Sequence, residues 1–462
     1  MNFLDFNLKD ELNLAIKEAG FKEPSPIQKE AIPLILDGND LIGQAHTGTG
    51  KTAAFGLPIL DKIDPKNGVE ALVIVPTREL ATQVSDEIYR FGKYLNIKSA
   101  TVYGGSSYSR QIEHIKKASI VVATPGRLLD LLENKKISIK PKFVVLDEAD
   151  EMLDMGFLED IQKIFAYLPK ERQTLLFSAT MSKEIKELAQ KILKDPKSVS
   201  ITKSEVTNSN INQQFYVVEE NERDDALIRL LDFKDPQKAI IFCRMKKEVD
   251  RLRDFLNAQG YNTKGLHGDM DQREREAVIR SFKKGSLELL IATDVAARGL
   301  DVEGVTHVIN YHLPFDSASY VHRIGRTGRA GKDGEAISIV TPSEFRALWR
   351  IQKSIGSQIQ SKVLPRIEDV LEKRESTLEK SIQTQNILPQ AINILEKLKK
   401  DLDLETIALK VISLLAEDEK VKGADIIGKD QKEIKKLFQK ALKRDPKQKR
   451  GRSRRKRSRK RS

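Results

Sequence analysis

Two adjacent carboxylates, Asp147 and Glu148, follow an apolar run in the segment KFVVLDEADEML, residues 142–153. The run from Phe143 to Leu146 is typical of a short strand buried in a parallel sheet. Carboxylates at the C-terminal end of such a strand lie at the edge where open α/β sheets bind ligands. Buried anions there need a cation, and a metal ion carried by a nucleotide supplies one. The alternative is an ordinary acidic helix N-terminus, which the helix dipole also favours.

The segment AHTGTGKT, residues 45–52, is a second place where residue types and spacing indicate chemistry. It matches the phosphate-binding loop pattern except that Ala45 occupies the position expected for the first glycine. Gly48 and Gly50 allow tight backbone conformations that turn several N–H groups toward phosphate oxygens. An apolar pair before the segment and a predicted helix after it, over residues 53–63, are the strand and helix that such a loop connects.

The last two residues of this loop complete a predicted nucleotide site. Lys51 would reach the β- and γ-phosphates, and the Thr52 hydroxyl would bind Mg²⁺. Asp147 would then hold the Mg²⁺ indirectly, while Glu148 would position the attacking water. The loop therefore favours the catalytic interpretation of the acidic strand end over that of a solvated helix terminus.

The composition indicates a folded, well-solvated protein of two or three domains. The chain has 462 residues, of which 39% are apolar and 32% are charged. No apolar run approaches the roughly 18 residues of a membrane span, and the acidic N-terminal segment lacks the order of a signal peptide. The one cysteine, Cys243, excludes an internal disulfide and a cysteine zinc site, and its apolar neighbours predict a buried thiol. We therefore expect a cytoplasmic location.

The formal net charge of +13 is concentrated at one end of the chain. Residues 447–462, KQKRGRSRRKRSRKRS, hold 11 Lys and Arg and no acid, which leaves 69 basic against 67 acidic residues elsewhere. Such a segment cannot bury enough apolar surface to fold, so we expect a disordered tail. A tail of this kind is typical of an arm that binds polyanions, most commonly phosphate backbones, although a solvated charge run without a specific role is the alternative.

Short apolar runs alternate with helical patterns along residues 1–203 and again along residues 211–350, on either side of the polar segment 204–210. Each half is typical of an α/β fold with an open parallel sheet and helices on both faces, and the polar segment reads as a linker. The predicted strands are ALVIVP, ATVYG, SIVVATP, FVVLDEAD and TLLFSAT in the first half, and AIIFCR, TKGLHG, LLIATDVAARG, HVINYHL and AISIVTP in the second.

The strand patterns stop at about residue 351, so residues 351–446 are predicted to form a helical extension. Two apolar stripes at helical spacing fit either dimerisation or packing against the second domain. The stripes comprise Leu404, Ile407, Ala408, Val411, Leu414 and Leu415, and then Ile434, Leu437, Phe438 and Ala441. No aromatic, RNP-like strand pattern occurs there, so we expect no RRM-type accessory domain.

A dozen motifs in fixed order resemble those of the DEAD-box ATP-dependent RNA helicases, over about residues 1–345. The first half contains Phe3, GFKEPSPIQ (20–28), AHTGTGKT (45–52), PTREL (76–80), Gly104–Gly105, TPGR (124–127), DEAD (147–150) and SAT (178–180). The second half contains IFCR (241–244), QRER (272–275), ATDVAARGLD (292–301) and HRIGRTGR (322–329). The resemblance implies two tandem RecA-like domains. His46 and His312 depart from the usual pattern, but neither position has a catalytic role in the family.

The resemblance implies an ATP and Mg²⁺ site shared by the two domains. The Gln28 amide would read the adenine edge, because it can both donate and accept, and Phe21 would stack on the base. The implied nucleotide-binding residues are Phe3, Phe21, Gln28, Ala45, Thr47, Gly48, Gly50, Lys51, Thr52, Gly299 and Asp301. The implied catalytic residues are Lys51, Asp147, Glu148, His322, Arg326 and Arg329, and Thr52 and Asp147 would hold the metal.

Three arginines of HRIGRTGR, Arg323, Arg326 and Arg329, recur at three-residue intervals, and helical spacing would place them on a common face. Since cations on one face repel each other, a purely structural role is not expected for them. By resemblance, Arg326 and Arg329 are arginine fingers that stabilise charge on the γ-phosphate. His322 would join the interdomain contacts beside Asp150.

The resemblance also implies residues that bind RNA and residues that couple the two ligands. The RNA residues would read phosphates and 2′-hydroxyls, which predicts little sequence preference. They are Thr77, Arg78, Gly105, Thr124, Arg127, Arg244, Gln272, Arg275, Thr293 and Asp294. Ser178 and Thr180 would hydrogen-bond around Asp150 and link the state of ATP to the binding of RNA.

The activity implied by this resemblance is RNA-dependent ATP hydrolysis coupled to local unwinding of short duplexes and remodelling of RNA–protein complexes. ATP and single-stranded RNA would close the cleft between the domains jointly. Ribosome assembly, RNA decay and stress response are the suggested settings, and an ATP-locked RNA clamp in a larger assembly is the alternative. A DNA helicase is a weaker alternative. The extension faintly resembles the helical segment of bacterial cold-shock members, some of which dimerise through it.

Overall fold

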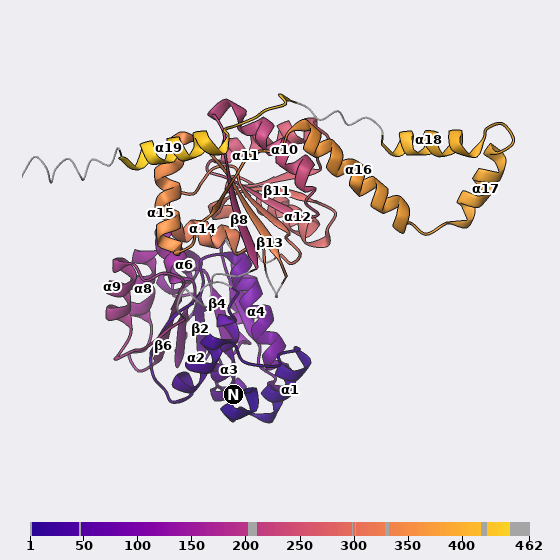
Figure 1. Cartoon of the computed structure of the whole chain (residues 1–462). Coiled ribbons are helices and arrows are strands. Elements are labelled where there is room, and N and C mark those ends of the chain that lie inside the picture. The colour runs from indigo at the N-terminus through magenta and orange to yellow at the C-terminus, as the bar shows by residue number, and fades with distance from the viewer. Residues whose placement is uncertain are drawn as a thin grey trace, which may run out of the picture.

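The computed structural model describes residues 2–45, 48–201, 210–297, 299–300, 302–328, 332–416 and 423–443, without the side chains of residues 441–443. Two parallel sheets with helices on both faces form two domains that lie one above the other (Figure 1). The predicted α/β class with tandem RecA-like domains is confirmed. No helix within these ranges is long and apolar enough to cross a membrane.

The first domain has a seven-stranded sheet in the order β3-β4-β2-β5-β6-β1-β7, and every pair of neighbouring strands is parallel. Its strands are β1 (Leu41–Gln44), β2 (Ala71–Ile74), β3 (Ser99–Val102), β4 (Ile120–Ala123), β5 (Phe143–Leu146), β6 (Gln173–Ser178) and β7 (Lys197–Ser200). Side chains alternate along β5, so that Val145 enters one core and Val144 the other. The parallel order brings the C-terminal ends of β1 and β5 to the same edge of the sheet.

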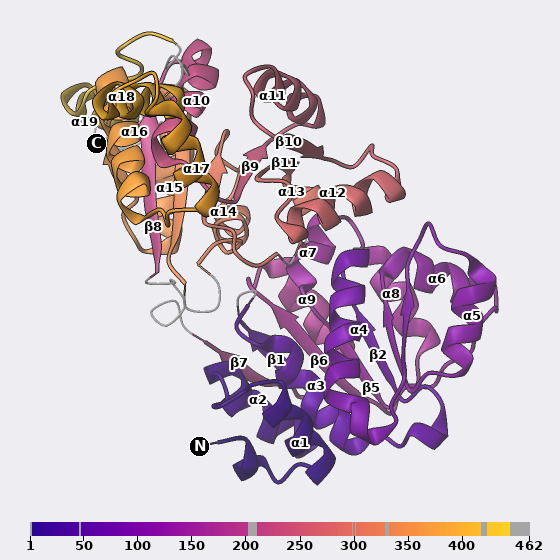
Figure 2. The same cartoon turned by 90° about the vertical axis from the view of Figure 1, so that its right-hand side faces the viewer.

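Helices cover both faces of this sheet (Figure 2). They are α1 (Asp10–Glu18), α2 (Pro26–Leu36), α3 (Lys51–Lys62), α4 (Arg78–Gly92), α5 (Tyr108–Lys116), α6 (Pro125–Glu133), α7 (Ala149–Asp154), α8 (Leu158–Tyr167) and α9 (Lys183–Ile192). Short 3₁₀ turns occur at η1 (Phe3–Phe6), η2 (Pro65–Asn67) and η3 (Lys93–Leu95). Helices α3, α4, α6 and α7 each begin within a few residues of a strand end, which places their N-termini at the ligand-binding edge.

The second domain repeats the design with the parallel order β10-β11-β9-β12-β13-β8-β14. Its strands are β8 (Ile211–Val217), β9 (Ala239–Cys243), β10 (Thr263–Leu266), β11 (Leu289–Thr293), β12 (His307–Asn310), β13 (Gly334–Val340) and β14 (Gln360–Lys362). Its helices are α10 (Arg223–Lys234), α11 (Lys246–Ala258), α12 (Gln272–Lys284), α13 (Asp294–Ala297), α14 (Ser317–Ile324) and α15 (Phe345–Ile355), with 3₁₀ turns η4 (Glu220–Glu222) and η5 (Pro342–Glu344). Cys243 is buried in β9, as predicted, and burial raises the pKa of its thiol.

All ten strands predicted from the sequence are present, and each begins within two residues of its expected start. Two of them end clearly earlier than expected, because β5 ends at Leu146 and β11 at Thr293, before the motif residues that the predicted segments included. The expectation that strands stop at about residue 351 is wrong, because β14 pairs with β8 as the edge strand of the second sheet. The second domain therefore continues to about residue 364, where Leu364 is buried in its core. The segments assigned to the linker and the basic tail lie outside the described residues, apart from Asn210.

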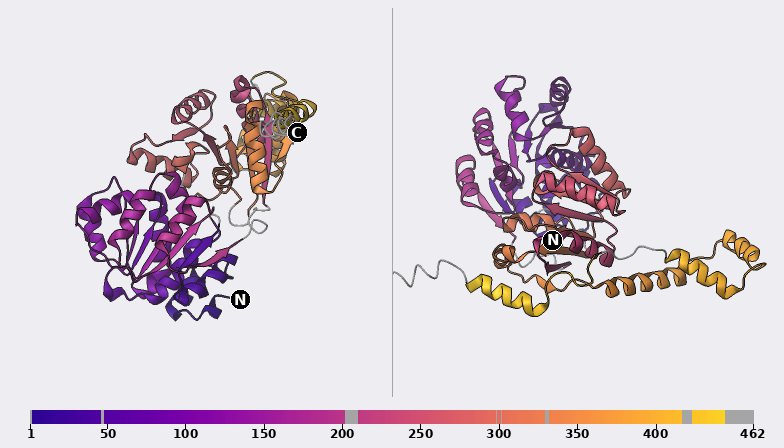
Figure 3. Two further views of the ribbon diagram at one scale, coloured as in Figure 1. Left: turned by 90° about the vertical axis from the view of Figure 1, so that its left-hand side faces the viewer. Right: turned by 90° about the horizontal axis from the view of Figure 1, so that it is seen from above.

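The helical extension divides into an arm and a returning helix. Helices α16 (Ile367–Thr384), α17 (Pro389–Leu398) and α18 (Leu404–Leu415) form the arm, which points away from the body, whereas α19 (Gln431–Lys443) lies back on the second domain (Figures 1 and 3). Most apolar side chains of α17 and α18 are exposed. Of the two predicted stripes, the second packs on the core and the first does not.

Both ends of the arm are fixed at the same place on the second domain. The Arg229 guanidinium is buried and donates to the carbonyls of Pro365, Ala424 and Asp425, at 2.8–3.2 Å. Beyond these residues, the backbone of Gly428 has a φ of +80°, and a Cβ there would lie 2.5 Å from the Val217 carbonyl oxygen. The chain therefore leaves the second domain and returns to it at the same place, with the arm between these two points.

Candidate active site

The phosphate-binding loop connects β1 to α3, as the sequence predicts. Gly48 and Gly50 have φ values of +84° and +88°, conformations that L side chains rarely adopt. Gly50 precedes the first helical residue, Lys51, whose side chain is buried with 6% of its surface exposed. The Lys51 ammonium lies 3.8 Å from the Asp147 carboxylate but makes no hydrogen bond among the described residues. Thr52 follows in the first turn of α3.

The carboxylates after β5 are held in a buried, crowded site. Asp147 accepts a hydrogen bond of 2.9 Å from the Glu148 backbone N–H. The pKa of Asp147 is raised to about 6, chiefly by burial; the Lys51 charge opposes this rise, and the charges of Glu148 and Asp150 contribute to it. Glu148 has a φ of 54° and a ψ of 51°, an unfavourable conformation for a non-glycine residue that re-aims the chain as α7 begins.

These residues fit a nucleotide with a divalent cation. A buried ammonium without a hydrogen-bond partner needs an anion, and the glycine conformations leave backbone N–H groups at the start of α3 for phosphate oxygens. Three buried carboxylates face one lysine, so the site has an excess of negative charge that a cation would neutralise. No cluster of His, Cys, Asp and Glu that could hold a metal by itself occurs in the described part of the chain.

Asp150 connects the acidic strand end to β6. Its carboxylate accepts hydrogen bonds from the Thr180 backbone N–H at 2.8 Å and from the Thr180 hydroxyl at 3.1 Å. The Ser178 hydroxyl donates to the Thr180 carbonyl at 2.7 Å and so orders the loop. We expected this hydroxyl to bond to Asp150, but its hydrogen bond goes to Thr180. Hydrogen bonds therefore join Asp150 to the loop after β6.

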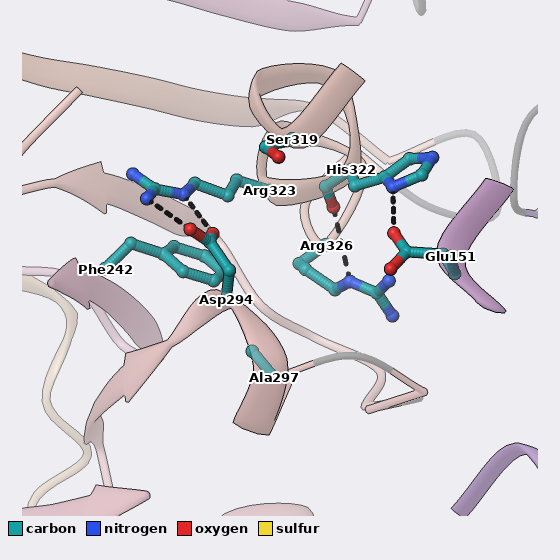
Figure 4. A pocket seen from close by; sticks show the side chains of 8 residues that line it. All are labelled: Glu151, Phe242, Asp294, Ala297, Ser319, His322, Arg323 and Arg326. Carbon is teal, nitrogen blue, oxygen red and sulfur yellow. Dashed lines mark hydrogen bonds and ion pairs between the residues drawn. The ribbon is translucent and has the colours of Figure 1, made fainter. Parts of the chain in front are cut away.

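The second domain reaches this acidic edge through α14 (Figure 4). His322 forms a hydrogen-bonded ion pair with Glu151 of α7, the residue after the predicted neighbour Asp150. Both side chains line a small pocket between the domains, together with Arg326 and Asp294. Burial alone would lower the pKa of His322, but Glu151, with help from Asp150 and Glu148, raises it above its ordinary value.

Arg323 and Arg326 do not share a helical face, because α14 ends at Ile324 and Gly325 caps it. Arg323 is buried and structural, contrary to the sequence prediction: it forms two hydrogen bonds with Asp294, of 2.5 and 2.8 Å. Arg326 donates to the Leu300 carbonyl at 2.8 Å, which leaves other N–H groups of its guanidinium for a ligand. Arg329 lies outside the described residues.

Gln28 is buried against the phosphate-binding loop. Its amide nitrogen donates to the Gly50 carbonyl at 3.0 Å, and its amide oxygen accepts from the Ser25 N–H at 2.9 Å. One further donor and one further acceptor position of the amide remain for a base edge. Phe21 is half-buried and packs edge-on against Phe3, at a centroid distance of 6.0 Å. Phe3 itself is buried and supports Phe21, and its part in nucleotide binding stays a prediction.

The remaining residues implied for the nucleotide have different surroundings. Ala45 is buried at the end of β1. Gly299 lies against the start of α4 in the first domain, where a Cβ would be 2.3 Å from the Thr77 hydroxyl. This glycine therefore permits close approach of the two domains, and its contact with ribose and phosphates stays a prediction. Thr47 and Asp301 lie outside the described residues.

Several residues implied for RNA bind one another across the interface between the domains. The Arg78 guanidinium of α4 donates to the Gln272 amide oxygen of α12 at 2.8 Å. Arg275 of α12 pairs with Glu79 of α4 at 2.5 Å. A Cβ on Gly105 would lie 2.6 Å from the Arg78 guanidinium, so this arginine packs against the glycine backbone. The structure thus brings motifs from both halves of the sequence together at one seam.

Other residues implied for RNA already have internal partners. The Arg127 guanidinium lies 4.0 Å from the centre of the Tyr108 ring and donates to the Ser106 carbonyl at 3.0 Å. Arg244 pairs with Glu344 at 2.7 Å. Thr77 and Thr124 cap α4 and α6, and Thr293 ends β11, so these hydroxyls lie at strand and helix ends.

Sequence reasoning missed the acidic partners of this network. Glu151, Glu79 and Glu344 each neutralise a motif residue, namely His322, Arg275 and Arg244. Two of them lie within or beside motifs, so a search for charge complementarity between motifs of the two halves could have found them. Glu344 lies outside every motif and gave no such signal.

A phosphate-binding loop and an acidic strand end in one parallel-sheet domain, facing basic residues of a second, define the class of two-domain helicase ATPases. Residues 25–188 match the model of the DEAD/DEAH box helicase family, and residues 222–331 match that of the helicase conserved C-terminal domain. The chain is 51% identical to the DEAD-box ATP-dependent RNA helicase RhpA of Helicobacter pylori (strain B128), over 94% of this chain and 86% of that protein.

Further comparisons agree. The chain is 45% identical to the DEAD-box ATP-dependent RNA helicase CshA of Bacillus subtilis (strain 168), over 90% of this chain and 86% of that protein. The solved structure of S. cerevisiae Dbp5 bound to RNA and ADP BeF3 is similar with a TM-score of 0.72 and 35% identity, over 78% of this chain and 95% of that one. The chain belongs to the family of DEAD-box ATP-dependent RNA helicases.

Proposed function

We propose that the chain hydrolyses ATP in an RNA-dependent manner and uses the cycle to separate short RNA duplexes locally. The observation that carries the proposal is the divided site: Lys51 and Asp147 belong to the first domain, and His322 of the second domain pairs with Glu151, which follows the same acidic strand end. Neither half is a complete catalytic site, so turnover depends on how the domains meet.

Within this site, the residues of the chain have separate roles. Lys51 and the backbone at Gly48 and Gly50 bind phosphates, while Asp147 and Thr52 hold Mg²⁺, which neutralises phosphate charge when bound. Glu148 orients the attacking water and accepts its proton. Arg326 stabilises charge on the γ-phosphate, and we extend this role to Arg329 from the family pattern. The Gln28 amide reads adenine.

RNA would bind where the domains already meet. Arg78, Gln272 and Arg275 are bound to partners at the seam, and their guanidinium and amide groups are of the kind that contacts phosphate and 2′-OH. A bound RNA strand would replace these contacts with contacts of its own and so shift the arrangement of the two domains. That shift would in turn affect Asp150 and Thr180. This is the proposed basis of RNA dependence.

The arm is proposed to pair with the arm of a second copy. Exposed apolar residues along α17 and α18 are too many to be scattered surface residues, and identical arms are complementary in chemistry. They are Ile392, Ile394, Leu398, Leu404, Leu409, Val411, Ile412, Leu414 and Leu415. We also propose that the tail, residues 447–462, tethers RNA by electrostatic attraction, and that the protein acts in the cytoplasm in ribosome assembly or RNA decay, including under stress.

A strand-displacement assay tests the main proposal. A short RNA duplex with a single-stranded overhang should be separated with ATP, and turnover of ATP should rise on addition of RNA. Displacement of DNA duplexes alone would contradict the proposal. Stable RNA retention with a non-hydrolysable ATP analogue, without displacement in ATP, would instead favour an ATP-locked clamp.

A further inference from the structure

A strip of cations on α15 surrounds the single tryptophan of the chain. Arg346, Trp349, Arg350 and Lys353 occupy helix positions i, i+3, i+4 and i+7, so they lie on one face. All four are exposed, and the Lys353 ammonium lies 5.1 Å from the centre of the indole ring. The buried residues of α15 pack on the opposite side. We call these four residues the basic strip.

Helix α19 extends this charged area. Ile434, Leu437 and Phe438 pack on the second domain, and the Phe438 ring meets that of Phe345 edge-on at a centroid distance of 5.4 Å. Figure 1 shows α19 lying across the end of α15. The face of α19 away from the core carries exposed lysines, namely Lys432, Lys435, Lys436 and Lys440. The basic strip and these lysines together form what we call the α15–α19 surface.

The surface is continuous with two regions already assigned to RNA or ATP. At one end, the Ser354 hydroxyl of α15 bonds to that of Ser317 at the start of α14, the helix that carries His322, at a distance of 2.8 Å. At the other end, the sequence beyond α19 contains residues 447–462 with their 11 cations. The surface therefore lies between the active-site helix and the basic tail.

The charge and the aromatic content of this surface indicate which class of ligand it binds. Residues 345–355 contain three cations and no acid, whereas a face that only needs solvation usually mixes both signs. Exposure of the Trp349 indole does not stabilise the fold, because burial of a tryptophan removes more apolar surface from water than burial of almost any other side chain. Aromatic rings among cations are the chemistry that holds single-stranded nucleic acid, by base stacking and by phosphate contacts.

We propose that the α15–α19 surface is a second RNA-binding surface, outside the seam between the domains, on which Trp349 stacks on a base while the surrounding cations contact phosphates. The choice of RNA as the polyanion rests on the proposed function. The surface holds a flank of the RNA whose other part occupies the seam. Because the fold fixes the strip relative to α14, the surface gives the bound strand a set direction.

The single tryptophan allows a direct test with the full chain. Titration with a single-stranded oligoribonucleotide, with excitation selective for tryptophan, should quench the fluorescence in a saturable way. Arg350→Glu with Lys353→Glu should weaken the quench and raise the Kd for RNA about tenfold, because two phosphate contacts are lost. The slope of log K against log[salt] should become shallower by about 1.4.

A matched double variant, Lys9→Glu with Lys66→Glu, makes the same change in net charge at exposed positions of the first domain and should leave quench and Kd unchanged. Absence of quenching by RNA overturns the proposal, and so does an equal quench in the strip variant. Quenching by anionic lipid vesicles but not by RNA would also overturn it. RNA stimulation of ATPase, measured on the same sample, separates failure of this surface from failure of the proposed function.

Discussion

Glu148 is the residue on which hydrolysis should depend most. Glu148→Gln keeps the size and the backbone geometry of the strand end but removes the acceptor for the proton of water. We expect turnover to fall by about 10²–10⁴-fold, while the Kd values for ATP and RNA change little. Single-turnover hydrolysis and equilibrium binding measure the two effects separately. Glu159→Gln, at an exposed position of α8, is the matched control, and similar turnover in both variants would remove Glu148 from the mechanism.

Asp147 should destabilise the protein when no nucleotide or metal is bound. Its pKa rises from 3.8 to about 6 on folding, so the folded state holds the proton more tightly than the unfolded chain. The unfolding free energy therefore decreases as the pH rises through the interval from 3.8 to 6. Above this interval the loss is complete and is about 3 kcal/mol.

Asp147→Asn should accordingly raise the unfolding free energy of the ligand-free protein at pH 7, although we expect it to abolish ATPase activity. The gain should shrink as the pH is lowered toward 4.5, because the wild-type carboxyl then becomes protonated. Denaturant unfolding in chelator at both pH values measures this difference, and Asp86→Asn on an exposed position of α4 is the control. A gain of equal size at both pH values would contradict a titration of Asp147.

At the scale of elements, the contact of α14 with α7 should make closure of the domains sensitive to pH. The pKa of His322 is raised by Glu151, so their ion pair is complete below the ordinary value of 6.5 and is lost as the pH rises through the raised value. We expect the closed population, with ATP analogue and RNA bound, to decrease toward alkaline pH. His322→Gln should flatten this dependence within the same interval.

Energy transfer between dyes on Lys66→Cys and Lys284→Cys, both exposed positions, measures the closed population. The native Cys243 is buried and its thiol pKa is raised, so it should not compete for the dyes. If the histidine variant retains the full pH dependence, another group controls closure.

The elements predicted from the sequence are those with strong apolar patterns, such as β5 with its run FVVL. Strands β7, KSVS, and β14, QSK, were missed because they lie at or beside sheet edges, where polar side chains are tolerated. The helical face expected for the arginines failed at Gly325, since a single glycine cap ends α14 before Arg326.

The candidate site also contains features that the sequence pattern predicts and features that it does not predict. Motif positions indicated which residues gather at the strand ends, because parallel order alone brings those ends together. Partners across the seam, such as Glu79 for Arg275, depend on how two separately folded domains meet, and no periodicity within one domain encodes that arrangement.

At the scale of the whole molecule, the arm should determine the oligomeric state. Val411→Glu with Leu415→Glu places charges on the exposed apolar stripe of α18, and we expect a dimer to become a monomer because buried, unpaired carboxylates are costly. Light scattering coupled to size-exclusion chromatography measures the mass. Ser413→Glu, an exposed polar position of the same helix, should leave the mass unchanged. A wild-type protein that is monomeric at micromolar concentration would contradict pairing through the arm.

Because Arg229 binds both ends of the arm, the arm can be replaced as a unit. Chain entry at Pro365 and chain exit at Ala424 are held by one guanidinium, so residues between them can be shortened, exchanged or cut without moving α19. A protease that nicks the arm should leave two fragments that copurify, because α19 keeps its own packing on α15 through Phe438. Relatives of this chain could therefore acquire different assembly modules at this insertion point while the catalytic body and the origin of the tail stay the same.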